Sequence, residues 1–134
     1  MLLVCGAALW KGGPEERLAG AALLLNTAVT LVLRDFALPF EAGGFAADIA
    51  TLLLLGVVAL RSIKFWPMFA AAFQLLGVMT HVAKIIDPAV RPWAYYTAIV
   101  IWTYLIYIAL GVGTLNAWRE RRLAPSRARP RAGP

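Results

Sequence analysis

The segment Phe73–Pro88, FQLLGVMTHVAKIIDP, contains the only histidine of the chain and, three residues later, a lysine. At about 100° per residue of a helix, Gln74, His81 and Lys84 fall on one face, within an arc of about 80°. The residues around them are mostly leucine, isoleucine, valine and methionine. A single polar stripe on an otherwise apolar helix is a candidate for ion pairing, ligand binding or proton transfer.

Asp48 is the acidic residue that we expect to face this stripe. Counting about 1.5 Å per residue from the ends of the expected helices places Asp48, His81 and Lys84 about 5–9 Å below one surface of a membrane. Thr30 and Thr97 fall at a similar depth. We therefore predict one polar cluster in the outer third of the membrane, made of Thr30, Asp48, His81, Lys84 and Thr97. Three further polar residues are predicted to lie deeper: Asn26, Gln74 and Tyr104.

Two interpretations of this cluster stay open. An ionisable group within a membrane costs about 2.5–3.5 kcal/mol on insertion scales and is a functional candidate by default. A histidine beside a carboxylate also suits proton transfer near neutral pH. In the structural interpretation, Lys84 extends outward to the membrane surface, or Asp48 and Lys84 form a stabilising ion pair.

The composition predicts an integral membrane protein. The chain has 134 residues, of which 61% are hydrophobic and 15% charged. Soluble domains are about 45–50% apolar and about 25% charged, and a chain of this length has too little interior to bury the excess. The lipid bilayer is therefore the expected partner of the apolar surface.

The hydrophobic segments predict an all-α fold, a four-helix transmembrane bundle in a single unit of residues 13–119. A span needs about 20 residues, with a range of about 17–25. The expected spans are about 14–34, 42–60, 65–86 and 92–119. Before them, residues 1–12 form an apolar half-helix, too short to span, which either lies in the interface, packs against the bundle or continues an upstream helix.

Basic residues predict the orientation. With the C-terminus inside, ten lysines and arginines lie on the inner side and three on the outer side, as the positive-inside rule requires. Residues 120–134 are predicted to be a basic, disordered cytoplasmic tail, with Arg119, Arg121 and Arg122 in contact with anionic lipid headgroups. The net charge of +6 comes without an aromatic-basic platform, so we expect no nucleic-acid binding. The excess of arginine over lysine, with abundant alanine, favours a bacterial inner membrane.

Several chemistries lack their residues. One histidine and one cysteine, Cys5, supply neither a usual zinc site nor a bis-histidine haem site, so no metal and no cofactor are expected. No phosphate-binding loop or nucleophile elbow occurs. We therefore assign no catalytic residue.

Three functions remain as hypotheses. In the first hypothesis, the chain is an accessory or interaction subunit of an inner-membrane complex, and it assembles as a homo-oligomer or within a larger complex. Alternatively, it is a small transporter, channel or proton-coupled unit that uses Asp48, His81 and Lys84. The third hypothesis is an interfacial enzyme, with His81 as base, Asp48 orienting it and Thr30 or Thr97 as nucleophile.

Overall fold

The computed structural model describes the backbone of residues 1–35 and 40–127 and the side chains of residues 1–32 and 43–123. These residues form five α-helices and, within the described ranges, no strand, which confirms the all-α prediction. The helices are α1 (Leu2–Lys11), α2 (Pro14–Asp35), α3 (Phe40–Arg61), α4 (Trp66–Ile86) and α5 (Pro92–Arg127).

Proline and acidic residues set several helix boundaries. Pro14 opens α2, where its missing N–H is not needed, and Glu15 and Glu16 follow in the first turn, where the helix dipole favours negative charge. Helix α4 ends at Ile86 because Pro88 disfavours a helical conformation at the preceding residue.

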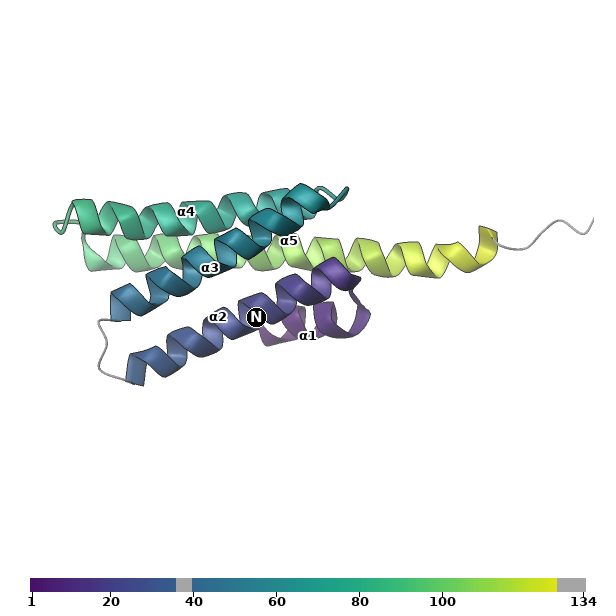
Figure 1. Ribbon diagram of the computed structural model, residues 1–134, viewed down its shortest axis with the longest axis horizontal. Coiled ribbons are helices and arrows are strands. Elements are labelled where there is room, and N and C mark those ends of the chain that lie inside the picture. The colour runs from purple at the N-terminus through teal and green to yellow at the C-terminus, as the bar shows by residue number, and fades with distance from the viewer. Residues whose placement is uncertain (36–39, 128–134) are drawn as a thin grey trace, which may run out of the picture.

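Helices α2 to α5 run antiparallel to their neighbours in sequence and form an elongated bundle (Figure 1). Helix α4 packs against both α3 and α5, and α2 packs against α3 and α1. We call the end at which α2 leads into α3 and α4 into α5 the α2–α3 end. The opposite end, where α3 leads into α4, is the α3–α4 end. Helix α5 projects past the other helices at the α3–α4 end.

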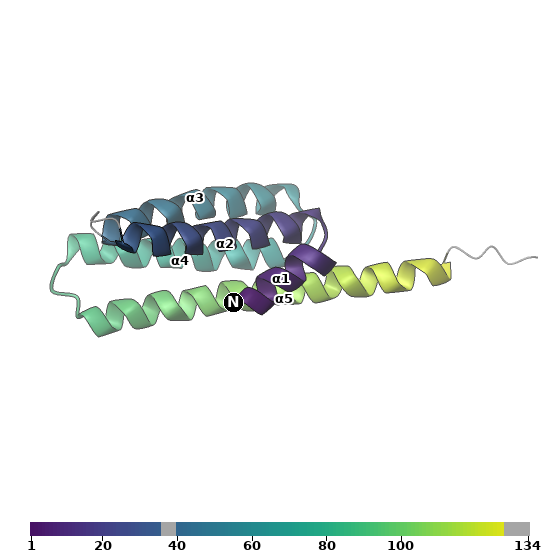
Figure 2. The ribbon, with the colours of Figure 1, turned by 90° about the horizontal axis from the view of Figure 1, so that it is seen from below.

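The half-helix α1 lies between α2 and α5 and crosses α5 obliquely (Figure 2). Its inner face consists of small residues: Cys5 and Ala8 are fully buried. A Cβ atom on Gly20 of α2 would lie 3.2 Å from Cβ of Ala8, so the absence of a side chain at Gly20 lets the two helices approach closely. Of the placements left open by the sequence, the structure shows packing against the bundle.

Three helices are long and apolar enough to cross a membrane within the described residues: Gly43–Arg61, Trp66–Ile86 and Pro92–Leu123. The part of the fourth predicted span whose side chains the structure describes, residues 14–32 of α2, does not meet the same requirement. Glu15, Glu16 and Arg17 occupy its first turn, which limits the uncharged run to Leu18–Leu33. The structure is therefore consistent with an integral membrane protein, while the count of four spans stays a prediction.

Two helices extend beyond their predicted boundaries. Helix α3 begins at Phe40, so Gly43 and Gly44 lie inside it and do not interrupt it. Helix α5 continues to Arg127, whereas we expected it to end at Arg119 and lead into a disordered tail. Residues 128–134 of that predicted tail lie outside the described residues.

Candidate functional site

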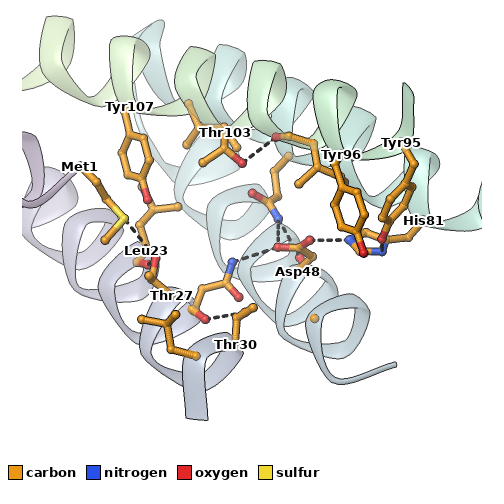
Figure 3. A pocket seen from close by; sticks show the side chains of 16 residues that line it. Met1, Leu23, Thr27, Thr30, Asp48, His81, Tyr95, Tyr96, Thr103 and Tyr107 are labelled. Carbon is orange, nitrogen blue, oxygen red and sulfur yellow. Dashed lines mark hydrogen bonds and ion pairs between the residues drawn. The ribbon is translucent and has the colours of Figure 1, made fainter. Parts of the chain in front are cut away.

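Asp48 accepts hydrogen bonds from three side chains on two other helices (Figure 3). Its Oδ1 atom accepts from Nδ2 of Asn26 on α2 at 2.9 Å and from Nε2 of Gln74 on α4 at 3.0 Å. Its Oδ2 atom lies 3.0 Å from Nε2 of His81, also on α4. Hydrogen-bond donors of this kind compensate a carboxylate for the loss of water.

Tyr95 of α5 extends this arrangement. Its hydroxyl lies 2.7 Å from Nδ1 of His81, so both ring nitrogens of His81 have a partner. His81 and Tyr95 are both buried. The rings of Phe45 and Tyr95 lie 5.6 and 5.5 Å from the imidazole, centroid to centroid, and restrict its orientation. We call Asn26, Asp48, Gln74, His81 and Tyr95 the Asp48 cluster.

The partners of His81 determine which nitrogen carries its proton in the neutral ring. A carboxylate accepts hydrogen bonds and cannot donate, so Nε2 must donate to Asp48. Nδ1 is then an acceptor, and the phenol of Tyr95 donates to it. The result is one directed chain, from the Tyr95 hydroxyl through the His81 imidazole to the Asp48 carboxylate. A chain of this kind can pass a proton by shifting each hydrogen bond in turn.

The Asp48 cluster lines a cavity of about 300 Å³ between α2, α3, α4 and α5. Most of its wall is apolar or aromatic, including Leu23, Ile99, Ile106 and Tyr107. The Asp48 side chain keeps 20% of its surface exposed. A carboxylate in an apolar cavity with a few oriented polar groups is the usual composition of a small-molecule site.

Lys84 does not belong to the Asp48 cluster, contrary to the prediction. Its Nζ atom donates to the backbone oxygens of Pro88 and Val90 at 3.1 and 3.0 Å. The last carbonyls of a helix and the turn that follows attract a cation, and Lys84 lies in the last turn of α4.

The structure distributes the other predicted polar residues differently. Thr30 lines the cavity, but its hydroxyl donates to the backbone oxygen of Asn26 in the preceding turn. Thr97 is exposed and is not among the cavity residues. Asn26 and Gln74, expected to lie deeper, bond Asp48 directly, whereas Tyr104 is 64% exposed on the outside of α5. His81 bonds Asp48 and Tyr95, so neither predicted nucleophile, Thr30 or Thr97, is its hydrogen-bond partner.

A second polar cluster lies at the α3–α4 end, and the sequence analysis missed it. Glu16 is fully buried, and its Oε1 atom accepts from Nζ of Lys64 at 2.8 Å and from Nε1 of Trp66 at 3.0 Å. Glu15 lies 3.5 Å from Lys64 and accepts from Ser62 at 2.9 Å. We call these five residues the Glu16 cluster. It connects the start of α2 to the segment between α3 and α4.

The predicted lipid-binding arginines lie near this second cluster. Arg121 donates to the backbone oxygen of Gly12 at 3.0 Å and so ties α5 to the turn between α1 and α2. The guanidinium of Arg122 lies 3.9 Å from the ring centroid of Trp118, a cation–π contact. Arg119 is exposed. Contact of these arginines with lipid stays a prediction.

Within the part of the chain that the structure describes, no three histidine, cysteine, aspartate or glutamate side chains come together in a way that could hold a metal ion. Three comparisons with known proteins found no match: no family model, no curated protein and no solved structure matches the chain.

Proposed function

We propose that this protein is a small proton-coupled transport unit, with Asp48 as the carboxylate that binds both proton and ligand. The observation that carries the proposal is the chain from Tyr95 through His81 to Asp48 at the wall of a cavity of about 300 Å³. A purely structural carboxylate would be expected to lie in a filled core. Here it faces an open space that a ligand can occupy.

The proposal includes four membrane spans, α2 to α5, with the C-terminus in the cytoplasm of a bacterium. The uncharged run of α2 is shorter than a usual span, but α2 lies antiparallel beside α3 and its charged first turn falls at the α3–α4 end (Figure 1). The excess of lysine and arginine at that end supports an inside location for it by the positive-inside rule. Reporter fusions after Arg127 and within residues 36–39 test this topology, since only one of the two should be active outside.

Proton flux through reconstituted protein tests the function. Liposomes that contain the protein and a trapped pH dye are given a pH gradient, with potassium and valinomycin to clamp the potential. We expect protein-dependent flux that Asp48→Asn and His81→Ala reduce to the level of empty liposomes. Lys84→Ala is the matched control, because Lys84 is a nearby charged residue outside the cluster. Equal flux in wild type and Asp48→Asn, both correctly folded, would refute the function.

An interaction subunit is the second candidate, and one observation favours it. A groove of about 550 Å³ runs between α4 and α5 toward the α3–α4 end, with the exposed rings of Phe65 and Phe69 on its wall. A partner helix or a second copy of the chain could bury these rings. Crosslinking in intact membranes from cysteines introduced at Phe69 tests this, with Ile49, an exposed residue of α3, as the control position.

A further inference from the structure

The open side of the cavity, the carboxylate of Asp48 and the unpaired amide oxygen of Asn26 point to a particular ligand. We propose that the cavity binds a lipophilic primary ammonium, which enters from the bilayer between α2 and α5. This inference rests on the proposed function of the cavity as a ligand site and names the class of ligand.

The charge of the site favours a cation. Among the described residues, Asp48 receives hydrogen bonds from two neutral amides and from His81, and from no lysine or arginine side chain. Lys84 lies three residues after His81 on α4, but its ammonium group donates to the backbone oxygens of Pro88 and Val90 and not to Asp48. The carboxylate therefore keeps a negative charge that a cationic ligand would neutralise inside an apolar wall, where such pairing is strongest.

A second acceptor indicates that the cation carries N–H groups. Asn26 lines the cavity, and its Oδ1 atom is buried without a hydrogen-bond partner among the described residues. Buried amide oxygens are normally paired, so this atom requires a donor. A primary ammonium has three donors and no acceptor, which matches a site with a carboxylate at the cavity wall and an unpaired, enclosed amide oxygen on a neighbouring side chain.

The walls of the cavity favour a ligand whose remaining part is apolar and can contact aromatic rings. Leu23, Ile99 and Ile106 supply apolar surface, and the rings of Tyr96 and Tyr107 also line the cavity (Figure 3). Aromatic faces add favourable contacts with a nearby cation. The volume of about 300 Å³ is at the lower limit for ligand sites, so it suits a molecule of about one ring with a short chain.

The cavity opens sideways between α2 and α5. Leu31 of α2 and Tyr96 and Thr103 of α5 line it and are also exposed at the surface. A neighbouring hollow on α5 shares Met1, Ile99, Thr103 and Tyr107 with the cavity and continues over the exposed Val100 and Tyr104.

The N-terminal end of the chain, beside α1, covers part of the same opening between α2 and α5. Met1 lines the cavity, and the hydroxyl of Thr27 lies 3.5 Å from its sulfur atom. If α2 and α5 both span the membrane, the remaining opening faces lipid, so a ligand dissolved in the bilayer reaches Asp48 without crossing water.

One carboxylate cannot hold a proton and an ammonium at the same time. An ammonium that binds Asp48 therefore displaces any proton on the carboxylate, and the reverse step releases the ammonium. This exchange is the coupling that the proposed transport function requires. When the ammonium leaves, Nε2 of His81 can give its proton to Asp48 while Nδ1 takes the hydroxyl proton of Tyr95, which water then replaces.

A matched pair of probes tests the ligand class. The protein in lipid nanodiscs is dialysed at pH 7.5 against 4-butylbenzylammonium or the neutral 4-butylbenzyl alcohol, with empty nanodiscs to subtract partition into lipid. We expect saturable binding of the ammonium and binding of the alcohol at least about 30-fold weaker, the factor expected for loss of a buried charge pair. Equal affinity for both probes, or no saturable binding of the ammonium, would overturn the inference.

Three variants locate the site. Asp48→Asn should weaken ammonium binding by at least about 30-fold, and Lys84→Ala should leave it unchanged. Gly44→Leu provides an independent test, because Gly44 lines the cavity and a Cβ atom added there meets no atom within 4 Å. The leucine should fill the space beside Asp48 and block binding, while the NMR signals of His81 show that the cluster is intact. Unchanged binding in Gly44→Leu would place the ligand elsewhere.

The outcome separates this inference from the proposed function. Proton flux that depends on Asp48, without any ammonium binding, would overturn the ligand class and leave proton coupling standing. Ammonium binding that depends on Asp48, without flux in liposomes given both a pH gradient and the ammonium, would refute transport and leave the binding site standing.

Discussion

His81 and Asp48 share one hydrogen bond of 3.0 Å between Nε2 and Oδ2, while the opposite ring nitrogen of His81 lies 2.7 Å from the hydroxyl of Tyr95. Both ring nitrogens of the buried imidazole are therefore hydrogen-bonded, and the donors of the two bonds point in the same direction, from Tyr95 toward Asp48. This arrangement also has a spectroscopic consequence, because the chain contains a single histidine.

The tautomer of His81 is the first prediction. Since Asp48 accepts from Nε2, the neutral ring should carry its proton on Nε2 and leave Nδ1 unprotonated. Protein labelled with ¹⁵N-histidine should show this pattern directly. Asp48→Asn should shift the balance toward a mixture of tautomers, because an amide can donate as well as accept, whereas Tyr95→Phe should leave the proton on Nε2. A wild-type ring protonated on Nδ1 alone would contradict the geometry.

The second prediction concerns Gly113. A Cβ atom at this position would lie 2.6 Å from the ring of Trp66, and that ring is held by its bond to the buried Glu16. Gly113→Ala should therefore lower the free energy of unfolding by about 1–3 kcal/mol, the usual cost of overpacking. Gly111→Ala is the control, since its Cβ would meet only Val4 at 3.8 Å. Thermal unfolding in detergent, followed by tryptophan fluorescence, measures both; equal stability of the two variants would contradict the packing.

The helix register explains which parts of the site could be read from the sequence. The contact between Asp48 and His81 could be anticipated because both lie on the polar side of their helices and at the same end of the bundle. Asn26 was placed too deep relative to Asp48, because α3 was assumed to begin at about residue 42. Since α3 begins at Phe40, Asp48 lies about 12 Å from its start, and Asn26 lies at a similar distance from the end of α2.

A symmetric count across the hairpin would also have found Tyr95. The turn between α4 and α5 is residues 87–91, and His81 lies eight residues before its centre and Tyr95 six residues after it, so their distances from the turn are similar. Residues equally far from the turn of an antiparallel hairpin meet at one level. Helical periodicity within α5 alone does not single out Tyr95, so the predicted polar cluster did not include it.

Lys84 and the Glu16 cluster depend on features that helical periodicity does not encode. Lys84 turns toward carbonyls beyond the end of α4, although its Cα lies on the polar stripe. Glu16, Lys64 and Trp66 meet because the segment after Arg61 returns to the start of α2. In an antiparallel bundle, the start of α2 and the segment between α3 and α4 lie at the same end, so the proximity of these three residues could have been predicted.

The third prediction compares Glu16 with Glu15. Glu16 is fully buried and bonds two side chains, so Glu16→Gln removes the charge that compensates Lys64. We expect a loss of about 1–3 kcal/mol in the free energy of unfolding, less than for a fully buried pair because Lys64 is one-third exposed. Glu15→Gln should cost less than about 1 kcal/mol, since Glu15 is 31% exposed and farther from Lys64. Equal losses would mean that burial of Glu16 contributes nothing to the pair.

The fourth prediction follows from the pKa of Lys64. Burial of the ammonium acts to lower this pKa, but the hydrogen bond and charge of Glu16, together with Glu15, outweigh burial and hold the pKa above its ordinary value. A raised pKa in the folded state means that the ion pair contributes fully below the ordinary lysine pKa of about 10.4. Its contribution is then lost as the pH rises through the folded pKa.

The stability difference between wild type and Lys64→Met measures this contribution. The difference should be constant from about pH 8 to about pH 9.5 and should shrink above about pH 10.4. Other lysines and tyrosines ionise in both proteins, so their effects cancel in the difference. In a Glu16→Gln background the difference should be smaller throughout and should depend less on pH. A difference that stays constant up to about pH 11.5 would show that the ammonium of Lys64 does not stabilise the Glu16 cluster by its charge.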